Sequence, residues 1–147
     1  MVVIGGGHVG KALAELGKWV GYRVVLTDDR PEYANESHVA GLDDYVVCAP
    51  AEVVEKVQIT THTYIAAVTR GLPVDVNLIP ALLKTPAPYI GLIGSRRRWA
   101  LTVAALKQEY GLTDEQLTRV HPPGYVGAIL GIRPPPGELV HIDADTV

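Results

Sequence analysis

The stretch VVIGGGHVG, residues 2–10, decides the fold. Three apolar residues lead directly into a cluster of glycines, and helical apolar spacing begins after it. Gly5, Gly7 and Gly10 form the pattern G-x-G-x-x-G between the first predicted strand and a helix predicted over 8–20. There the first glycine permits a tight turn, the second lets a pyrophosphate approach the backbone, and the third lets helix and strand pack closely. The start of the helix offers unpaired N–H donors to the phosphates.

Five apolar runs alternate with segments of helical periodicity along the chain. Continuous apolar runs are typical of parallel strands that helices cover on both faces. The alternation predicts an α/β fold with a doubly wound, mainly parallel sheet and helices on both faces. The predicted strands are 1–4, 23–27, 45–49, 63–68 and 89–93. The helical spacing is carried by Val9, Leu13, Leu16 and Val20, then by Val76, Ile79, Leu82 and Leu83, and then by Val103, Leu106 and Tyr110.

Length and composition indicate one domain. With 147 residues, 48% of them hydrophobic, we expect a single domain over 1–147, with its core in 1–120 and an irregular tail over 121–147 that holds at most a short strand at LVHID. A net charge of −3 supplies no positive field for nucleic acid or for a membrane surface. No run reaches the roughly 20 apolar residues that span a bilayer. The lone Cys48 lies in an apolar run, which predicts a buried thiol and a cytoplasmic protein.

An acidic residue ends the second predicted strand. Asp28 is placed to accept hydrogen bonds from the hydroxyls of an adenosine ribose, which favours NAD over NADP. Because Arg30 follows two residues later, NADP remains an alternative ligand. The alternative is that the glycines only make a tight turn and that Asp28 only caps the loop before Pro31.

Polar residues also follow the last two predicted strands, where ligands of open α/β sheets bind. The two groups are Thr69, Arg70 and Gly71 after 63–68, and Gly94, Ser95 and Arg96 after 89–93. We expect Asp75 and Ser95 to cap the helices that come next. Because helical residues step by about 100°, Arg96, Arg97 and Arg98 cannot all face one ligand.

The histidines do not predict a metal site. His8, inside the glycine loop, either reaches the ligand or only covers the turn. His62 and His121 are expected to be structural or exposed. The His and Cys residues are scattered without ligand spacing, and no nucleophile has an obvious base beside it.

Three segments occur in order: VVIGGGHVGKALAELGKWVGYRVVLTDDRPEYAN, TYIAAVTRG and APYIGLIGSRRR. Together they resemble, over residues 2–121, the C-terminal Rossmann domain of the XdhC/CoxI family, accessory proteins for xanthine dehydrogenase and related molybdenum hydroxylases. The resemblance implies a chaperone rather than an enzyme, which binds molybdenum cofactor, supports its sulfuration and helps to load it into the apo-hydroxylase. By motif position, the nucleotide-type site would be Gly5, Gly7, Gly10 and Asp28, and the cleft would be lined by Thr69, Arg70, Gly71, Gly94, Ser95 and Arg96.

The sequence does not decide which ligand binds. A pterin dinucleotide also carries a pyrophosphate, so molybdenum cofactor, NAD, NADP and a flavin nucleotide all present the group that the loop recognises. Two alternatives to the chaperone are an NAD(P)-dependent oxidoreductase, for which the sequence shows no clear proton-transfer residue, and a nucleotide-sensing regulatory module.

Two departures from the family pattern lead to expectations about partners. Family members usually carry a separate N-terminal domain with a cysteine-containing motif. Because this sequence starts at the first strand, we expect the chain to be one part of either a split or a truncated protein, and in the first case that domain is a candidate partner. The end of the sequence shows no closing helix. A missing helix would expose part of one sheet face, and exposure of that kind drives self-association. We therefore expect a homodimer, besides the apo-hydroxylase as a partner.

Overall fold

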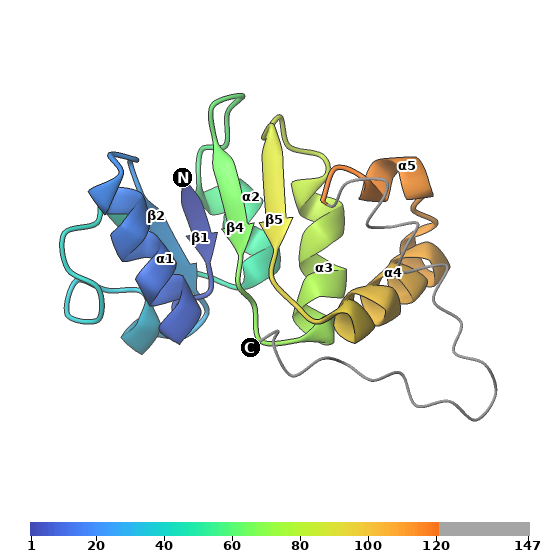
Figure 1. The fold of residues 1–147 in the computed structure, drawn as a ribbon, viewed down its shortest axis with the longest axis horizontal. Coiled ribbons are helices and arrows are strands. Elements are labelled where there is room, and N and C mark those ends of the chain that lie inside the picture. The colour runs from blue at the N-terminus through green and yellow to red at the C-terminus, as the bar shows by residue number, and fades with distance from the viewer. Residues whose placement is uncertain (121–147) are drawn as a thin grey trace.

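The computed structural model describes residues 1–120, in which five parallel strands form one sheet between two layers of helices (Figure 1). The strand order is β3-β2-β1-β4-β5. All five predicted strands are confirmed, as is the doubly wound α/β class. Their bounds are β1 (Val2–Ile4), β2 (Val25–Asp28), β3 (Asp44–Val47), β4 (Tyr64–Ala67) and β5 (Tyr89–Leu92). The predicted tail and its short strand lie outside the described residues.

Helices cover both faces of the sheet because side chains alternate along each buried strand. Val3 and Leu26 pack with α1 on one face, whereas Ile4, Ile65 and Ile90 pack with α3 and α4 on the other. The helices are α1 (His8–Trp19), α2 (Val53–Lys56), α3 (Leu72–Leu82), α4 (Arg96–Tyr110) and α5 (Asp114–Leu117), with 3₁₀ turns at Pro31–Tyr33 and Pro50–Glu52. In this part of the chain no helix is both long and apolar enough to cross a membrane.

The face that α1 buries differs from the one its large apolar residues indicate. Gly10, Ala14 and Gly17 are buried, and side chains of this size let the helix approach the sheet closely. A Cβ built on Gly17 would lie 3.1 Å from a methyl group of Val24. The larger Val9, Leu16 and Val20 are 53–54% exposed. The periodicity therefore predicted the helix correctly but not its packing.

The sheet reverses its strand order between β1 and β4. The chain runs from β1 to β2 on one side and later returns to β4 on the other side of β1. The loops after β1 and β4 consequently diverge to opposite sides of the sheet, which opens a crevice at the carboxyl ends of the strands. The glycine loop after β1 and the segment 68–71 after β4 lie at this end of the sheet (Figure 1).

Candidate functional site

The three glycines of the G-x-G-x-x-G pattern have different surroundings. Gly5 has φ +110°, and an added Cβ would lie 2.6 Å from the carbonyl oxygen of Val68. A Cβ on Gly10 would overlap the carbonyl oxygen of Gly5. Gly7, in contrast, would place its Cβ where no atom lies within 4 Å. The turn and the packing thus require the first and third glycines, while the backbone at the second stays open to an approaching group.

The peptide of Gly6 is held from both sides. Its N–H donates to Oδ2 of Asp28 at 2.7 Å, and its carbonyl oxygen lies 2.7 Å from Nε2 of His38. A Cβ on Gly6 would overlap the carbonyl oxygen of Tyr33. Sequence reasoning missed Gly6 and His38, and the only signal for the former was the uninterrupted run of three glycines.

The start of α1 is suited to an anion. Its N-cap, Gly7, supplies no side-chain hydrogen bond, and no acidic residue lies in the first turn. The first N–H groups of a helix have no partner within it, and the helix dipole places partial positive charge there. His8 occupies the first helical position and is exposed.

Both carboxylate oxygens of Asp28 already accept hydrogen bonds from the surrounding loops. Its carboxylate accepts from the N–H of Gly6, from the N–H of Arg30 at 3.0 Å, and from Nε and Nη2 of Arg30 at 2.9 and 3.0 Å. Burial by itself raises the pKa of Asp28, but the hydrogen bonds from Arg30 and Gly6 lower it to about 2. Arg30 also lies 3.7 Å above the ring of Tyr33. A ribose hydroxyl would reach the carboxylate only after the Arg30 side chain moves.

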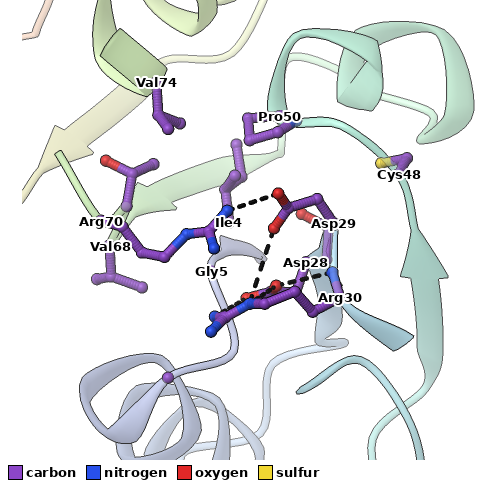
Figure 2. A pocket seen from close by; sticks show the side chains of 13 residues that line it. Ile4, Gly5, Asp28, Asp29, Arg30, Cys48, Pro50, Val68, Arg70 and Val74 are labelled. Carbon is purple, nitrogen blue, oxygen red and sulfur yellow. Dashed lines mark hydrogen bonds and ion pairs between the residues drawn. The ribbon is translucent and has the colours of Figure 1, made fainter. Parts of the chain in front are cut away.

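A small cavity of about 50 Å³ opens at the crevice (Figure 2). Six predicted residues line it: Gly5, Gly7, Asp28, Arg30, Thr69 and Arg70. The other lining residues are Ile4, Thr27, Asp29, Cys48, Pro50, Val68 and Val74. The remaining predicted residues, His8, Gly10, Gly71, Gly94, Ser95 and Arg96, lie outside this lining.

Thr27 lines the cavity and carries a buried hydroxyl group. Its side chain is 1% exposed, and among the described residues its Oγ1 has no hydrogen-bond partner. A buried hydroxyl left in this way costs stability, so a bound polar group that satisfies it would be favoured. Sequence reasoning missed Thr27 because it ends an apolar run that predicted only a strand.

An ion pair crosses the cavity. Nη2 of Arg70, from the loop after β4, lies 2.5 Å from Oδ2 of Asp29, which follows β2. Figure 2 shows the Arg70 side chain reaching over the glycine loop to this carboxylate. Ligand pockets usually enclose about 300–1,000 Å³, so a dinucleotide would require this pair to separate.

Cys48 is confirmed as a buried thiol, 6% exposed. Burial raises the pKa of the Cys48 thiol, and the nearby Glu52 carboxylate raises it further. The thiol therefore stays protonated and is a poor nucleophile. Among residues 1–120, no group of three or more His, Cys, Asp and Glu side chains could hold a metal ion.

A second polar cluster joins the loop after β4 to the start of α4. Asp75 is completely buried and accepts from Nε and Nη2 of Arg98, both at 2.7 Å. Arg98 also donates to the carbonyl oxygen of Thr69 at 3.1 Å, and the Thr69 hydroxyl donates to Asp75.

The expected cap at Asp75 is therefore wrong. Gly71 is the N-cap of α3, and the guanidinium of Arg98 engages the Asp75 carboxylate instead. The cap at Ser95 is confirmed, since its Oγ accepts from the N–H of Arg98 at 3.2 Å. The other two arginines, Arg96 and Arg97, are exposed.

Comparison with known proteins finds similar sequences and a similar fold. The family model "XdhC Rossmann domain" matches residues 1–136. A protein of Bacillus subtilis (strain 168), named as a probable xanthine dehydrogenase subunit, is 26% identical over 133 residues, 90% of this chain and 36% of the relative. "Uncharacterized protein YqeB" of Escherichia coli (strain K12) is 26% identical over 136 residues, 92% of this chain and 24% of that protein.

A solved structure agrees with these matches. A crystal structure described as that of a xanthine dehydrogenase from Bacillus halodurans superposes with a TM-score of 0.63 at 26% identity, covering 74% of this chain and 32% of the other. The chain thus spans roughly a quarter to a third of the length of these relatives. The ordered glycine loop, the parallel sheet and the family match over 1–136 lead to one conclusion: the chain belongs to the XdhC Rossmann domain family.

Proposed function

We propose that this chain is a ligand-binding accessory domain in the maturation of a molybdenum hydroxylase of the xanthine dehydrogenase type. It would hold a pyrophosphate-bearing ligand, either molybdenum cofactor in its dinucleotide form or NAD(P), and would pass it on without catalysing a reaction. The name of the Bacillus subtilis relative, which refers to xanthine dehydrogenase, supports the choice of client.

One observation carries the proposal: the open backbone at Gly7. Its neighbours Gly5 and Gly10 are packed against protein atoms, yet nothing in the described fold fills the space where a Gly7 side chain would lie. Since any residue can adopt its φ of −63°, the local turn does not require glycine here. A ligand that approaches the backbone closely would explain the glycine.

The residues around the cavity fit the phosphate end of such a ligand. The N–H groups at the start of α1 would donate to the phosphate oxygens, the Thr27 hydroxyl would gain a partner, and Arg70 would add positive charge once it leaves Asp29. Binding, rather than catalysis, is favoured because the cavity's thiol is protonated and its two carboxylates, Asp28 and Asp29, are paired with Arg30 and Arg70.

The first experiment is titration calorimetry of the full chain against NAD, NADP and extracted molybdenum cofactor. Binding of molybdenum cofactor supports the accessory role, whereas binding of NAD alone favours a redox or sensing domain. A pull-down with an apo-hydroxylase then separates cofactor handover from simple sensing.

Gly7→Val tests the site itself. Its side chain would occupy the space that the pyrophosphate needs, so we expect affinity to fall at least tenfold, which corresponds to about 1.4 kcal/mol. The fold should remain, as judged by thermal unfolding, because that space is free of protein atoms. Ala12→Val is the matched control, at an exposed position of the same helix. Full affinity in Gly7→Val would place the ligand elsewhere.

A further inference from the structure

The sheet face that α1 covers is only half covered in the described part of the chain. Val3 and Leu26 are buried under α1. On the same face of β4 and β5, Tyr64 and Tyr89 are paired across the strands and are 44 and 55% exposed. The helices that follow these strands, α3 and α4, pack against the opposite face.

The exposed half carries a row of aromatic rings. The ring centroids of Tyr22 and Tyr64 are 5.9 Å apart, and those of Tyr64 and Tyr89 are 6.4 Å apart. Tyr89 lies over bare backbone, since a Cβ on Gly91 would be 2.7 Å from its hydroxyl oxygen. Ile93, which directly follows β5, is 50% exposed.

One flank of α1 is also apolar. Val9, Leu16 and Val20 project from one side of the helix, because their positions differ by multiples of the helical turn. The basic residues point the other way: Lys11 donates to the carbonyl oxygen of His38, and Lys18 pairs with Asp43. The apolar flank is therefore the one nearer β4.

The exposed apolar side chains of α1, of the turn after it and of this side of β4 and β5 are together called the apolar face: Val9, Leu16, Trp19, Val20, Tyr22, Tyr64, Tyr89 and Ile93. None of them is charged, and tyrosine and tryptophan are enriched where proteins associate. At about 200 Å² for a full aromatic side chain, the four aromatic residues expose about 450 Å². That is more than half of the ~800 Å² that each partner contributes to a standard interface.

The two halves of the apolar face differ in height above the sheet. Within residues 1–120, α1 adds one helix layer of about 10 Å over β1 and β2, whereas no helix lies over β4 and β5 on this face (Figure 1). A two-fold axis near Tyr64 would lay the apolar flank of each α1 over the tyrosines of the other copy. Such an isologous contact fills the open layer on both copies at once.

We propose that the apolar face is the interface of a homodimer, in which α1 of each copy covers β4 and β5 of its partner. The occupant is a second copy of this chain, because the same surface supplies both the projecting helix flank and the recessed aromatic row. The proposal does not depend on which ligand the cavity binds.

Sedimentation velocity of the full chain from low to high micromolar concentration tests the proposal. We expect a dimer mass, and we expect the fluorescence of Trp19, 84% exposed in a single copy, to shift to shorter wavelength as dimers form. Trp19→Glu should weaken the dimer at least tenfold by burying a charge, and since the side chain projects into solvent it leaves the fold intact. Tyr89→Glu tests the sheet half of the interface.

Leu101→Glu is the matched control, since Leu101 is 53% exposed on α4, across the sheet. It should dimerise as the unaltered chain does. A monomer at every concentration would overturn the proposal and would leave residues 121–147 or an unrelated protein as the occupant of the face. A dimer unaffected by both Trp19→Glu and Tyr89→Glu would overturn it as well, because the interface would then lie elsewhere.

Discussion

Two aspartate–arginine pairs at the carboxyl ends of the strands have similar chemistry but different surroundings. Asp75 and Arg98 are 0 and 20% exposed, lie 23 residues apart in the sequence and join the first turns of α3 and α4. Asp28 and Arg30 are 3 and 28% exposed, come from one loop and border the cavity. The buried pair holds the start of α3 against the start of α4, whereas Asp28 of the cavity pair also binds the glycine loop through the N–H of Gly6.

The difference shows that the same pair of residue types can serve either the stability of the fold or the binding site. In each pair the arginine donates two hydrogen bonds to the carboxylate, the geometry that guanidinium groups favour. Only the cavity pair lies where ligand binding would rearrange it. Substitutions in the two pairs should therefore separate stability from binding.

Arg98→Met should have the largest effect. It leaves the fully buried Asp75 side chain without its main partner, and breaking a buried pair in this way typically costs about 3–5 kcal/mol. Urea denaturation would measure the loss. Arg97→Met, at the exposed neighbouring position, is the control and should change stability by less than about 0.5 kcal/mol.

A second variant shows whether the cost comes from the unpaired charge. Adding Asp75→Leu to Arg98→Met removes that charge and should recover part of the loss, because an apolar pair of similar volume is often tolerated in place of a buried ion pair. If Arg98→Met alone lowered the free energy of unfolding by less than about 1 kcal/mol, the buried pair would not contribute more to stability than the cavity pair, contrary to what its burial indicates.

Arg30→Met should have a smaller effect that depends on pH. The pKa of Asp28 is lowered from 3.8 to about 2 in the folded chain, so its contribution is complete above about pH 4 and disappears as the pH falls through about 2. Arg30→Met removes the largest of the interactions that lower this pKa. We expect it to cost on the order of 2 kcal/mol at pH 6.

The free energies of unfolding of the two proteins, measured at several pH values, check this. Their difference should shrink as the pH is lowered from 4 towards 2. A difference that stays constant over this range would mean that Arg30 stabilises the loop through its contact with Tyr33 rather than through Asp28.

Much of the fold could be predicted from the sequence because each strand coincides with an apolar run, including β4 and β5, where Tyr64 and Tyr89 leave one face exposed in the described part of the chain. Each apolar run lies within or overlaps an observed strand, and the glycine loop begins α1 where expected. The buried side of α1 could not be predicted in the same way. Gly10, Ala14 and Gly17 carry little hydrophobic signal, yet their small size decides which side meets the sheet.

The site was only partly predictable, because several of its contacts join residues that are far apart in the sequence. Gly5, Gly7 and Asp28 belong to local patterns, and all three line the cavity. The partnership of Asp75 with Arg98, and that of Asp29 with Arg70, depend on loops that only the folded sheet brings together. The local rule for helix caps assigned Asp75 to the cap of α3, whereas in the structure its carboxylate binds the guanidinium of Arg98, which is distant in the sequence.

The ion pair of Asp29 and Arg70 is a third aspartate–arginine pair, and it is more exposed than the other two. These side chains are 37 and 52% exposed, and an ion pair of that kind is worth about 0–1 kcal/mol. Asp29→Asn would release Arg70 and remove a negative charge from the phosphate end of the cavity. We expect affinity for NAD, or for whichever pyrophosphate ligand the chain binds, to rise by a few-fold.

Calorimetry with Glu32→Gln as control distinguishes release of Arg70 from a general change in charge. Glu32 is exposed, lies close by in the sequence and does not line the cavity, and its substitution removes the same charge. If Asp29→Asn and Glu32→Gln tighten binding equally, the effect is long-range electrostatics and Arg70 stays where it is. If only Asp29→Asn does so, and Arg70→Met added to it cancels the gain, then the guanidinium that closes the cavity is also the group that meets the incoming phosphate.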